Sequence, residues 1–177
     1  MDASSDTTMF PATPATAESA PTDQGTTTNG EFTEHIERVR AHRAELRDAV
    51  TGLDRALEAP IAQGDAWRDR VRGALSELAH DFDDHIAITE SSGGIYDRAM
   101  RTAPRLSGAV NRLLAEHEAF HEQIHRHLSA LEQGAQLPDL SAFREELTTL
   151  VGRLVRHRQA GGDLVYEAYN VDLGGMG

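Results

Sequence analysis

The stretch that decides the fold is residues 110–131, VNRLLAEHEAFHEQIHRHLSAL. Its apolar residues and two of its histidines recur at spacings of three and four, which is the period of one face of an α-helix. The spacing predicts an amphipathic helix that begins near Pro104 and buries histidines together with leucines. The residues of this face are Val110, Leu113, Leu114, His117, His121, Ile124, Leu128 and Leu131.

Three other segments show the same helical period. They span residues 31–58, residues 66–90 and the chain from Pro138 onward. Because none shows the alternation of a half-buried strand, we predict an all-α fold, an antiparallel up-and-down four-helix bundle over residues 31–177. Residues 1–30 are rich in Ala, Ser, Thr and Pro, and we predict a disordered tail there because such a segment buries too little apolar surface.

Composition limits the classes of function. The chain has 177 residues and a formal net charge of −12, which suits one domain and disfavours nucleic acid and anionic membranes as partners. It has no cysteine, so disulfides and thiolate metal sites are excluded. No apolar run approaches the roughly 18 residues of a membrane span. No secretory leader is evident either, so we expect a cytoplasmic protein.

Histidines lie on the apolar faces of all four predicted helices. A single buried histidine is usually a hydrogen-bonded core residue, but four such faces would leave several imidazoles without partners. A shared metal site accounts for them, because neutral imidazole is the commonest protein metal ligand. Counted from the turns between helices, these residues fall within a turn or two of one level along the bundle. They are His42, His85, His117, His121 and His157.

His117 and His121 form the strongest local signal. Residues four apart share a helix face with their Cβ atoms about 6 Å apart, which suits chelation of one ion. His125 and His127 are expected at the surface near the helix end. In the first helix, His35 is an alternative to His42, and the apolar face favours His42.

Carboxylates accompany two of these histidines. Glu90 follows His85 by five residues, and Asp163 follows His157 by six. Five histidines and two bridging carboxylates would suit two octahedrally coordinated ions with a position left open. Imidazole and oxygen ligands without sulfur favour iron, with manganese or zinc as alternatives.

Four motifs resemble the hemerythrin-like family of HHE cation-binding domains, over residues 31–170. They are HRAELR at 42–47, FDDHIAITE at 82–90, HEAFH at 117–121 and the segment from His157 to Asp163. The resemblance implies a non-heme di-iron centre in which His117, His121 and His157 would hold one iron. His42 and His85 would hold the other, and Glu90 and Asp163 would bridge the pair. The less crowded iron would bind dioxygen or peroxide.

The chain departs from the family pattern at both bridging positions. The family usually places a carboxylate four residues after the histidine of the second helix and five after that of the fourth, where this chain has Thr89 and Gly162. On a regular helix an offset of five rotates Glu90 about 140° away from its histidine. We therefore expect a π-bulge or an early helix end at Glu90 and a similar irregularity before Asp163, with Glu167 as the alternative bridge.

Two functions follow from the resemblance. The first is a dioxygen-binding protein that stores oxygen or senses oxygen or redox state, and the five-histidine ligand set supports it. The alternative is a di-iron enzyme, such as an oxidase, an oxygenase or a peroxide-decomposing protein, acting on a small molecule. A metal-free interaction bundle is a third hypothesis, which the cost of unpaired buried imidazoles disfavours. The sequence names no redox partner.

Overall fold

The computed structural model describes residues 24–132 and 139–170, with side chains described for residues 41–132 and 139–168. Five α-helices make up most of this part: α1 (Gln24–Glu58), α2 (Asp65–Thr89), α3 (Ile95–Thr102), α4 (Ser107–Glu132) and α5 (Leu140–Asn170). Two 3-10 turns, η1 (Ile61–Gln63) and η2 (Pro104–Leu106), precede α2 and α4. No strand occurs within the described ranges, so the all-α prediction is confirmed. None of the helices searched in these ranges is long and apolar enough to cross a membrane.

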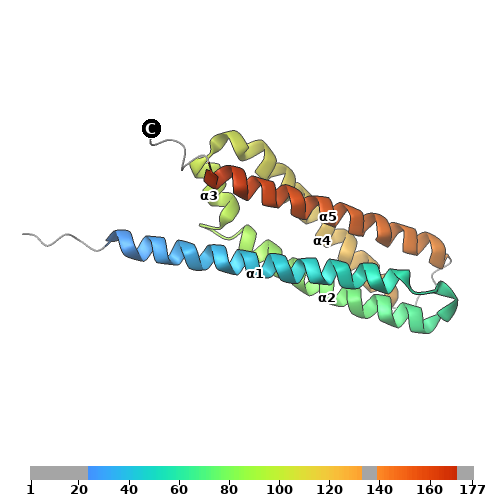
Figure 1. The fold of residues 1–177 in the computed structure, drawn as a ribbon. Coiled ribbons are helices and arrows are strands. Elements are labelled where there is room, and N and C mark those ends of the chain that lie inside the picture. Colours follow the sequence, from blue (N-terminus) through green and yellow to red (C-terminus); the bar gives the residue numbers. More distant parts are fainter. Residues whose placement is uncertain (1–23, 133–138, 171–177) are drawn as a thin grey trace, which may run out of the picture.

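The four long helices pack beside one another in a closed ring (Figure 1). α1 contacts α2, α2 contacts α4, α4 contacts α5, and α5 returns to α1. The short α3 sits near one end, where it contacts α4 and α5. Because every long helix has two long neighbours, its apolar stripe is covered from both sides.

Local signals set where two of the long helices begin. Gly64 has a φ of +60°, which L side chains disfavour, and it is the N-cap residue of α2. Before α5, the Asp139 carboxylate accepts the backbone N–H groups of Ser141 and Ala142 at 2.8 and 3.0 Å. Such a cap satisfies N–H groups that have no partner inside the helix. These turns therefore fix where the histidine-bearing faces of α2 and α5 start.

The end of α2 places an acidic side chain beside the core. The helix stops at Thr89, and Glu90 is its C-cap residue, with φ −94° and ψ −5°. Gly93 follows with a φ of +74°, and a Cβ on Gly94 would lie 2.6 Å from the carbonyl oxygen of Ser91. Both glycines are therefore needed for this turn. The early helix end expected at Glu90 is present in the structure.

The helix boundaries differ from the prediction in two places. α3 is absent from the prediction, because its 8 residues are too few to display a helical period. α1 begins at Gln24, inside the segment 1–30 whose composition indicates a tail, and residues 1–23 lie outside the described residues. Starting a helix is costly because several residues must be ordered before the first hydrogen bond forms, whereas extending it gains one hydrogen bond for each residue ordered. α1 can therefore continue into a segment that has no apolar face.

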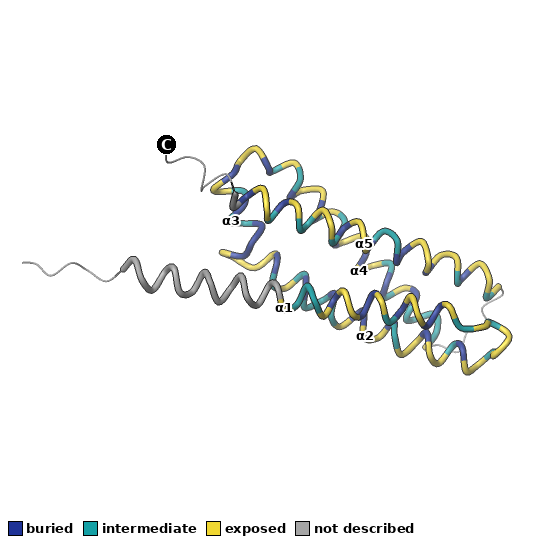
Figure 2. The backbone as a smooth tube through the Cα atoms, viewed as in Figure 1, coloured by how far each residue is buried: buried dark blue, intermediate teal, exposed yellow. Residues whose placement is uncertain are grey.

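Two apolar clusters fill the interior, formed by the buried positions that recur along the helices (Figure 2). His85, His117 and His157, which are buried, lie between the two clusters. The larger cluster joins α1, α2, α4 and α5 and includes Phe82 and Leu154. The smaller one joins α3, η2, α4 and α5 and includes Tyr96 and Leu164. His157 stands between Leu154 and Leu164 along α5, where one cluster gives way to the other. The site is therefore enclosed by apolar packing on two sides.

Candidate metal centre

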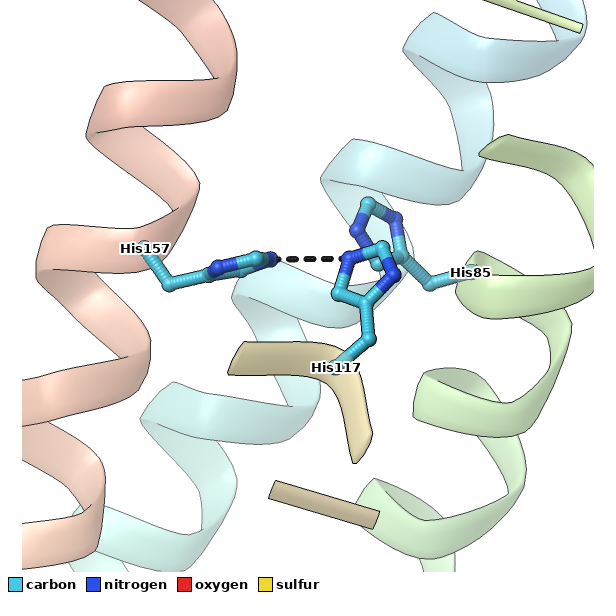
Figure 3. Close-up of side chains that lie close together, drawn as sticks. All are labelled: His85, His117 and His157. Carbon is cyan, nitrogen blue, oxygen red and sulfur yellow. Dashed lines mark hydrogen bonds between the residues drawn. The ribbon is translucent and has the colours of Figure 1, made fainter. Parts of the chain in front are cut away.

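Three buried histidines from three helices point toward one another (Figure 3). His85 comes from α2, His117 from α4 and His157 from α5, and each offers a ring nitrogen within 4.8 Å of the other two. The Nε2 atoms of His117 and His157 are 3.0 Å apart. Two adjacent ligands of one octahedral ion, with metal–nitrogen bonds of about 2.1 Å, stand at about this separation. The distance between these two nitrogens is therefore the distance expected between two ligands of one metal ion.

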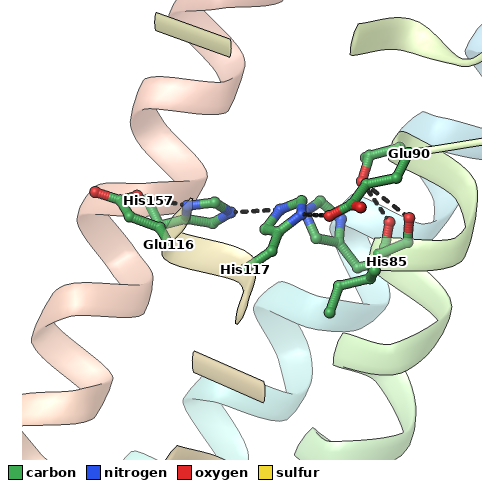
Figure 4. A network of polar contacts seen from close by, with 7 residues as sticks. His85, Glu90, Glu116, His117 and His157 are labelled. Carbon is green, nitrogen blue, oxygen red and sulfur yellow. Dashed lines mark hydrogen bonds and ion pairs between the residues drawn. The ribbon is translucent and has the colours of Figure 1, made fainter. Parts of the chain in front are cut away.

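Carboxylates hold two of the rings from behind (Figure 4). His117 Nδ1 lies 2.7 Å from Glu90 Oε1, and His157 Nδ1 lies 2.7 Å from Glu116 Oε2. Because an ionised carboxylate can only accept, the proton of each neutral ring is assigned to Nδ1. The two Nε2 atoms then carry lone pairs that face each other, and a cation between them would remove this repulsion. Carboxylates orient metal-ligating histidines in this way in many proteins.

His85 completes the set with an unpaired atom. Its Nε2 is buried and has no hydrogen-bond partner among the residues that the structure describes. Its ring centroid lies 5.0 Å from that of His117 and 5.9 Å from that of His157. An unpaired buried polar atom costs about 1–3 kcal/mol, which coordination to a metal would offset. Three imidazole nitrogens, two of them backed by carboxylates, therefore fit a metal cation.

Burial keeps the three imidazoles neutral, which is the form that binds metal. Burial first, and then the neighbouring rings of His117 and His157, lower the pKa of His85 from its ordinary 6.5 to about 3. Burial also lowers the pKa of His117 and of His157, although hydrogen bonds to Glu90 and Glu116 oppose the shift. At neutral pH a metal would therefore compete with almost no bound proton on these rings.

A small cavity adjoins the rings. Its volume is about 20 Å³, enough for one water-sized molecule, and Arg43, Tyr96 and Gly161 line it together with His85 and His157. Burial raises the pKa of Tyr96, so its phenol keeps the proton and can donate a hydrogen bond. Arg43, held by a 3.1 Å hydrogen bond from its guanidinium to a backbone carbonyl of α5, adds positive charge to the wall.

The structure brings together four of the residues that the sequence indicates for the centre and separates others. His85, Glu90, His117 and His157 meet in the interior. His121 was expected beside His117 but is 51 % exposed. Four residues turn a helix by about 40° beyond a full turn, and at that level apolar side chains of α4 fill the core face. His121 is thereby directed outward toward α2.

On α1 the expected ligand also lies apart. The His42 ring pairs with Glu45 of its own helix, Nδ1 to Oε2, at 2.8 Å. His42 is near enough to the centre to lower the pKa of His85, although it is the weakest of the contributions. The alternative ligand, His35, belongs to α1, but its side chain lies outside the described residues.

On α5 the expected bridging carboxylates face solvent. Asp163 is exposed and accepts a hydrogen bond from Gln159 at 3.1 Å, and Glu167 is exposed as well. The irregularity expected before Asp163 is missing, because α5 continues as one helix to Asn170. On a regular helix an offset of six leaves Asp163 about 120° away from His157, which directs it out of the core.

Two residues of the site are not indicated by the sequence pattern. Glu116 and Arg43 belong to no apolar face, and their long side chains reach the site from its edge. Gly162 makes room for Arg43, since a Cβ there would lie 2.7 Å from the guanidinium. Two signals could have indicated these residues. Glu116 directly precedes a buried histidine, and Arg43 faces a pair of glycines on another helix.

His127 is buried, which corrects the expectation that it lies at the surface. Its ring packs edge-on against Phe143 at 5.3 Å, and its Nε2 has no hydrogen-bond partner in the described part of the chain. His127 follows Phe120 by seven residues, and this places it about 20° from that core residue around α4. It therefore belongs to the core beyond the metal centre.

Acid is expected to destabilise the metal-free chain. Because burial lowers the pKa of His85, His117 and His157, the unfolded chain binds protons below its ordinary pKa of 6.5 that the folded chain does not. The free energy of unfolding is therefore highest above pH 6.5. As the pH drops toward the pKa that each ring has in the folded chain, this free energy falls by up to about 1.4 kcal/mol per pH unit for each ring. Urea unfolding between pH 7.5 and 5 in a chelator measures this slope.

Two variants test whether the slope comes from the buried rings. His85→Gln is expected to flatten the pH dependence, whatever it does to stability at pH 7.5. His80→Gln changes a histidine that is 77 % exposed and should leave the slope as in the wild type. Equal slopes for all three proteins would contradict the assignment.

A known protein family matches most of the chain. The family model of the hemerythrin HHE cation binding domain matches residues 34–160. No curated protein and no solved structure matches the chain. The matched span includes the three buried rings and both carboxylates that hold them. Since it covers well over half of the 177 residues, the chain belongs to the family of hemerythrin HHE cation-binding domains.

Proposed function

We propose that this chain is a non-heme iron protein that binds dioxygen, or peroxide, beside His85, His117 and His157. Iron, when bound, supplies the electrons that dioxygen accepts and a coordination position for it. The family match supports a cation, and a donor set of imidazoles and carboxylates without sulfur favours iron, with manganese or zinc as alternatives. The scaffold in this proposal is an up-and-down four-helix bundle, to which α3 is added.

The observation that carries the proposal is the convergence of three buried imidazoles, two of them held by carboxylates. Glu90 and Glu116 accept hydrogen bonds from Nδ1–H of neutral His117 and His157, so that the two Nε2 atoms, 3.0 Å apart, are available to a cation. The third ring, His85, adds an unpaired buried nitrogen. Without a metal, the contact between the two Nε2 atoms is a hydrogen bond only if one of them carries a proton, and the His85 nitrogen has no partner among the described residues. A cation would bind all three nitrogens.

The ligand set in this proposal differs from the one that the family resemblance implies. The three imidazoles would hold one iron. Glu90 and Glu116 would hold two of these rings in place, each 2.7 Å from a ring nitrogen. His121 and Asp163, whose side chains are exposed, are not ligands in this proposal.

The volume of the cavity limits the ligand to a very small molecule. A volume of about 20 Å³ accommodates one water-sized or diatomic molecule and no organic substrate. The Tyr96 phenol and the Arg43 guanidinium in its wall would hydrogen-bond and neutralise a ligand that gains negative charge. These features favour dioxygen binding over an oxygenase. A peroxide-decomposing enzyme, the second candidate, fits the same space.

Filling the cavity is expected to weaken dioxygen binding without removing the iron. Gly161→Ala would place a methyl group 3.9 Å from the Tyr96 hydroxyl, inside the cavity wall, and should lower dioxygen affinity about tenfold or more. The measurement is a titration of the reduced, iron-loaded protein with oxygen, followed by its near-ultraviolet and visible bands. A stable, reversible spectrum supports oxygen binding, whereas rapid decay with consumption of peroxide supports the enzyme.

Gly152→Ala is the matched control. It makes the same substitution on α5, away from the cavity, where the new methyl group meets only the end of Arg156 at 3.7 Å. Both variants gain helix propensity, about 1 kcal/mol, so neither should unfold. If the two variants bind dioxygen equally well, the ligand does not occupy this cavity.

A further inference from the structure

A second group of metal-binding side chains lies on the surface between α2 and α4. His121 and His125 stand four residues apart on α4, and their ring centroids are 4.4 Å apart. Both Nε2 atoms face the carboxylate of Asp83 on α2, at 3.4 Å from His121 and 3.3 Å from His125. These three ligand atoms lie within 4.8 Å of one another. Two helices thus present three potential ligands at one point.

The two contacts with Asp83 have the length expected between ligands of a single ion. Ligands bound tetrahedrally at about 2.0 Å are separated from each other by about 3.3 Å. The two nitrogen–oxygen distances, 3.3 and 3.4 Å, are close to this value. The contact between His125 and Asp83 has the geometry of a hydrogen bond, but at 3.3 Å it is long, since charge-assisted bonds usually measure about 2.7–2.9 Å. The contact of His121 with the same carboxylate, at 3.4 Å, is longer still.

The group is open to solvent, unlike the buried centre. The side chains of Asp83, His121 and His125 are 44 %, 51 % and 41 % exposed. A fourth, open coordination position would therefore be filled by water. Two imidazoles and one carboxylate select first-row transition metals over Mg²⁺ and Ca²⁺, which prefer oxygen ligands alone.

We propose that Asp83, His121 and His125 form a second, exchangeable site for a divalent transition-metal ion such as Zn²⁺. The bound ion would link α2 to α4 about one helical turn from His117, a ligand of the buried centre. Because the ligands come from both helices, the ion would hold them together and raise the thermal stability of the chain. The site is independent of the proposed iron and oxygen chemistry.

Zinc titration of the iron-loaded full-length chain tests this site. Calorimetry is expected to show one Zn²⁺ bound per chain, with at least about tenfold weaker binding in His125→Ala and in Asp83→Asn. The wild-type melting temperature should rise with Zn²⁺, and that rise should be lost in both variants. His80→Ala is the control, because His80 is an exposed histidine of α2 that lies 3.7 Å from the Asp84 carboxylate and belongs to neither group of potential metal ligands in the described residues.

The outcomes separate this site from the buried one. His125→Ala, which should lose Zn²⁺ at the surface, should keep as much iron as the wild type, because its ring is not part of the buried group. Failure of the wild type to bind Zn²⁺, equal binding by the wild type and His125→Ala, or an equal loss in His80→Ala would each overturn the proposal.

Discussion

Replacing His157 with alanine is expected to abolish iron binding, whereas replacing His121 leaves it intact. The His157 ring is buried, its Nε2 lies 3.0 Å from that of His117, and Glu116 holds it from behind. Its removal would delete one of the three proposed imidazole ligands and the ring that Glu116 contacts. His121 instead contacts Asp83 at the surface, so its loss removes nothing from the interior.

Metal analysis and thermal unfolding measure this difference. Iron per chain should fall to background in His157→Ala, and the variant should lose the stabilisation that iron gives, about 2.7 kcal/mol when free iron stands at 100 times its Kd. His121→Ala should match the wild type in both readouts. Loss of iron in His121→Ala would instead support the chelating pair that the sequence pattern predicts on α4.

The helical architecture could be predicted because it depends on a repeated signal. Apolar residues recur at helical spacing over segments of more than twenty residues, and Gly64 and Pro104 mark where such segments begin. α3 gives no such signal, since it has 8 residues and depends on contacts with α4 and α5. Length therefore decides which helices a periodic pattern can reveal.

The histidine layer could be predicted in outline, and its ligands only in part. His85, His117 and His157 occupy the centres of their apolar faces, so the helical period alone directs them inward. His121 lies at the margin of its face, where a rotation of about 40° decides between core and solvent. The sequence pattern does not decide whether the side chain of His121 faces the core or the solvent, because this depends on how α2 packs against α4.

Long side chains at the rim are the hardest part to predict. Glu116 and Arg43 reach the site across several ångströms from positions that look solvent-exposed in sequence. Their roles depend on what stands opposite them. For Arg43 this is the glycine pair of α5, where a Cβ on Gly162 would meet the guanidinium. Arg43 also donates a hydrogen bond to the backbone of Arg158, which lies 115 residues away in the sequence, and only the fold shows that the two residues are neighbours.

Phe82→Ala is expected to destabilise the chain and also to weaken iron binding. The ring is fully buried, and its centroid lies 6.0 Å from that of His85, 5.7 Å from His117 and 6.4 Å from His157. It therefore forms one wall against which all three proposed ligands pack. Truncation of a buried phenylalanine costs about 3–5 kcal/mol, and the cavity left behind would let the rings turn away from their common point.

Phe143→Ala separates the two effects of this substitution. Phe143 is also a core residue, 7 % exposed, but it lies 14 positions before His157 on α5, about 21 Å along the helix. Both variants should lose comparable stability in urea unfolding of the metal-free protein. Only Phe82→Ala should also bind iron less tightly in a competition with a chelator, and Phe82→Leu should recover most of that affinity because it restores much of the volume. If iron affinity falls equally in Phe82→Ala and Phe143→Ala, Phe82 contributes to the core and does not position the imidazoles.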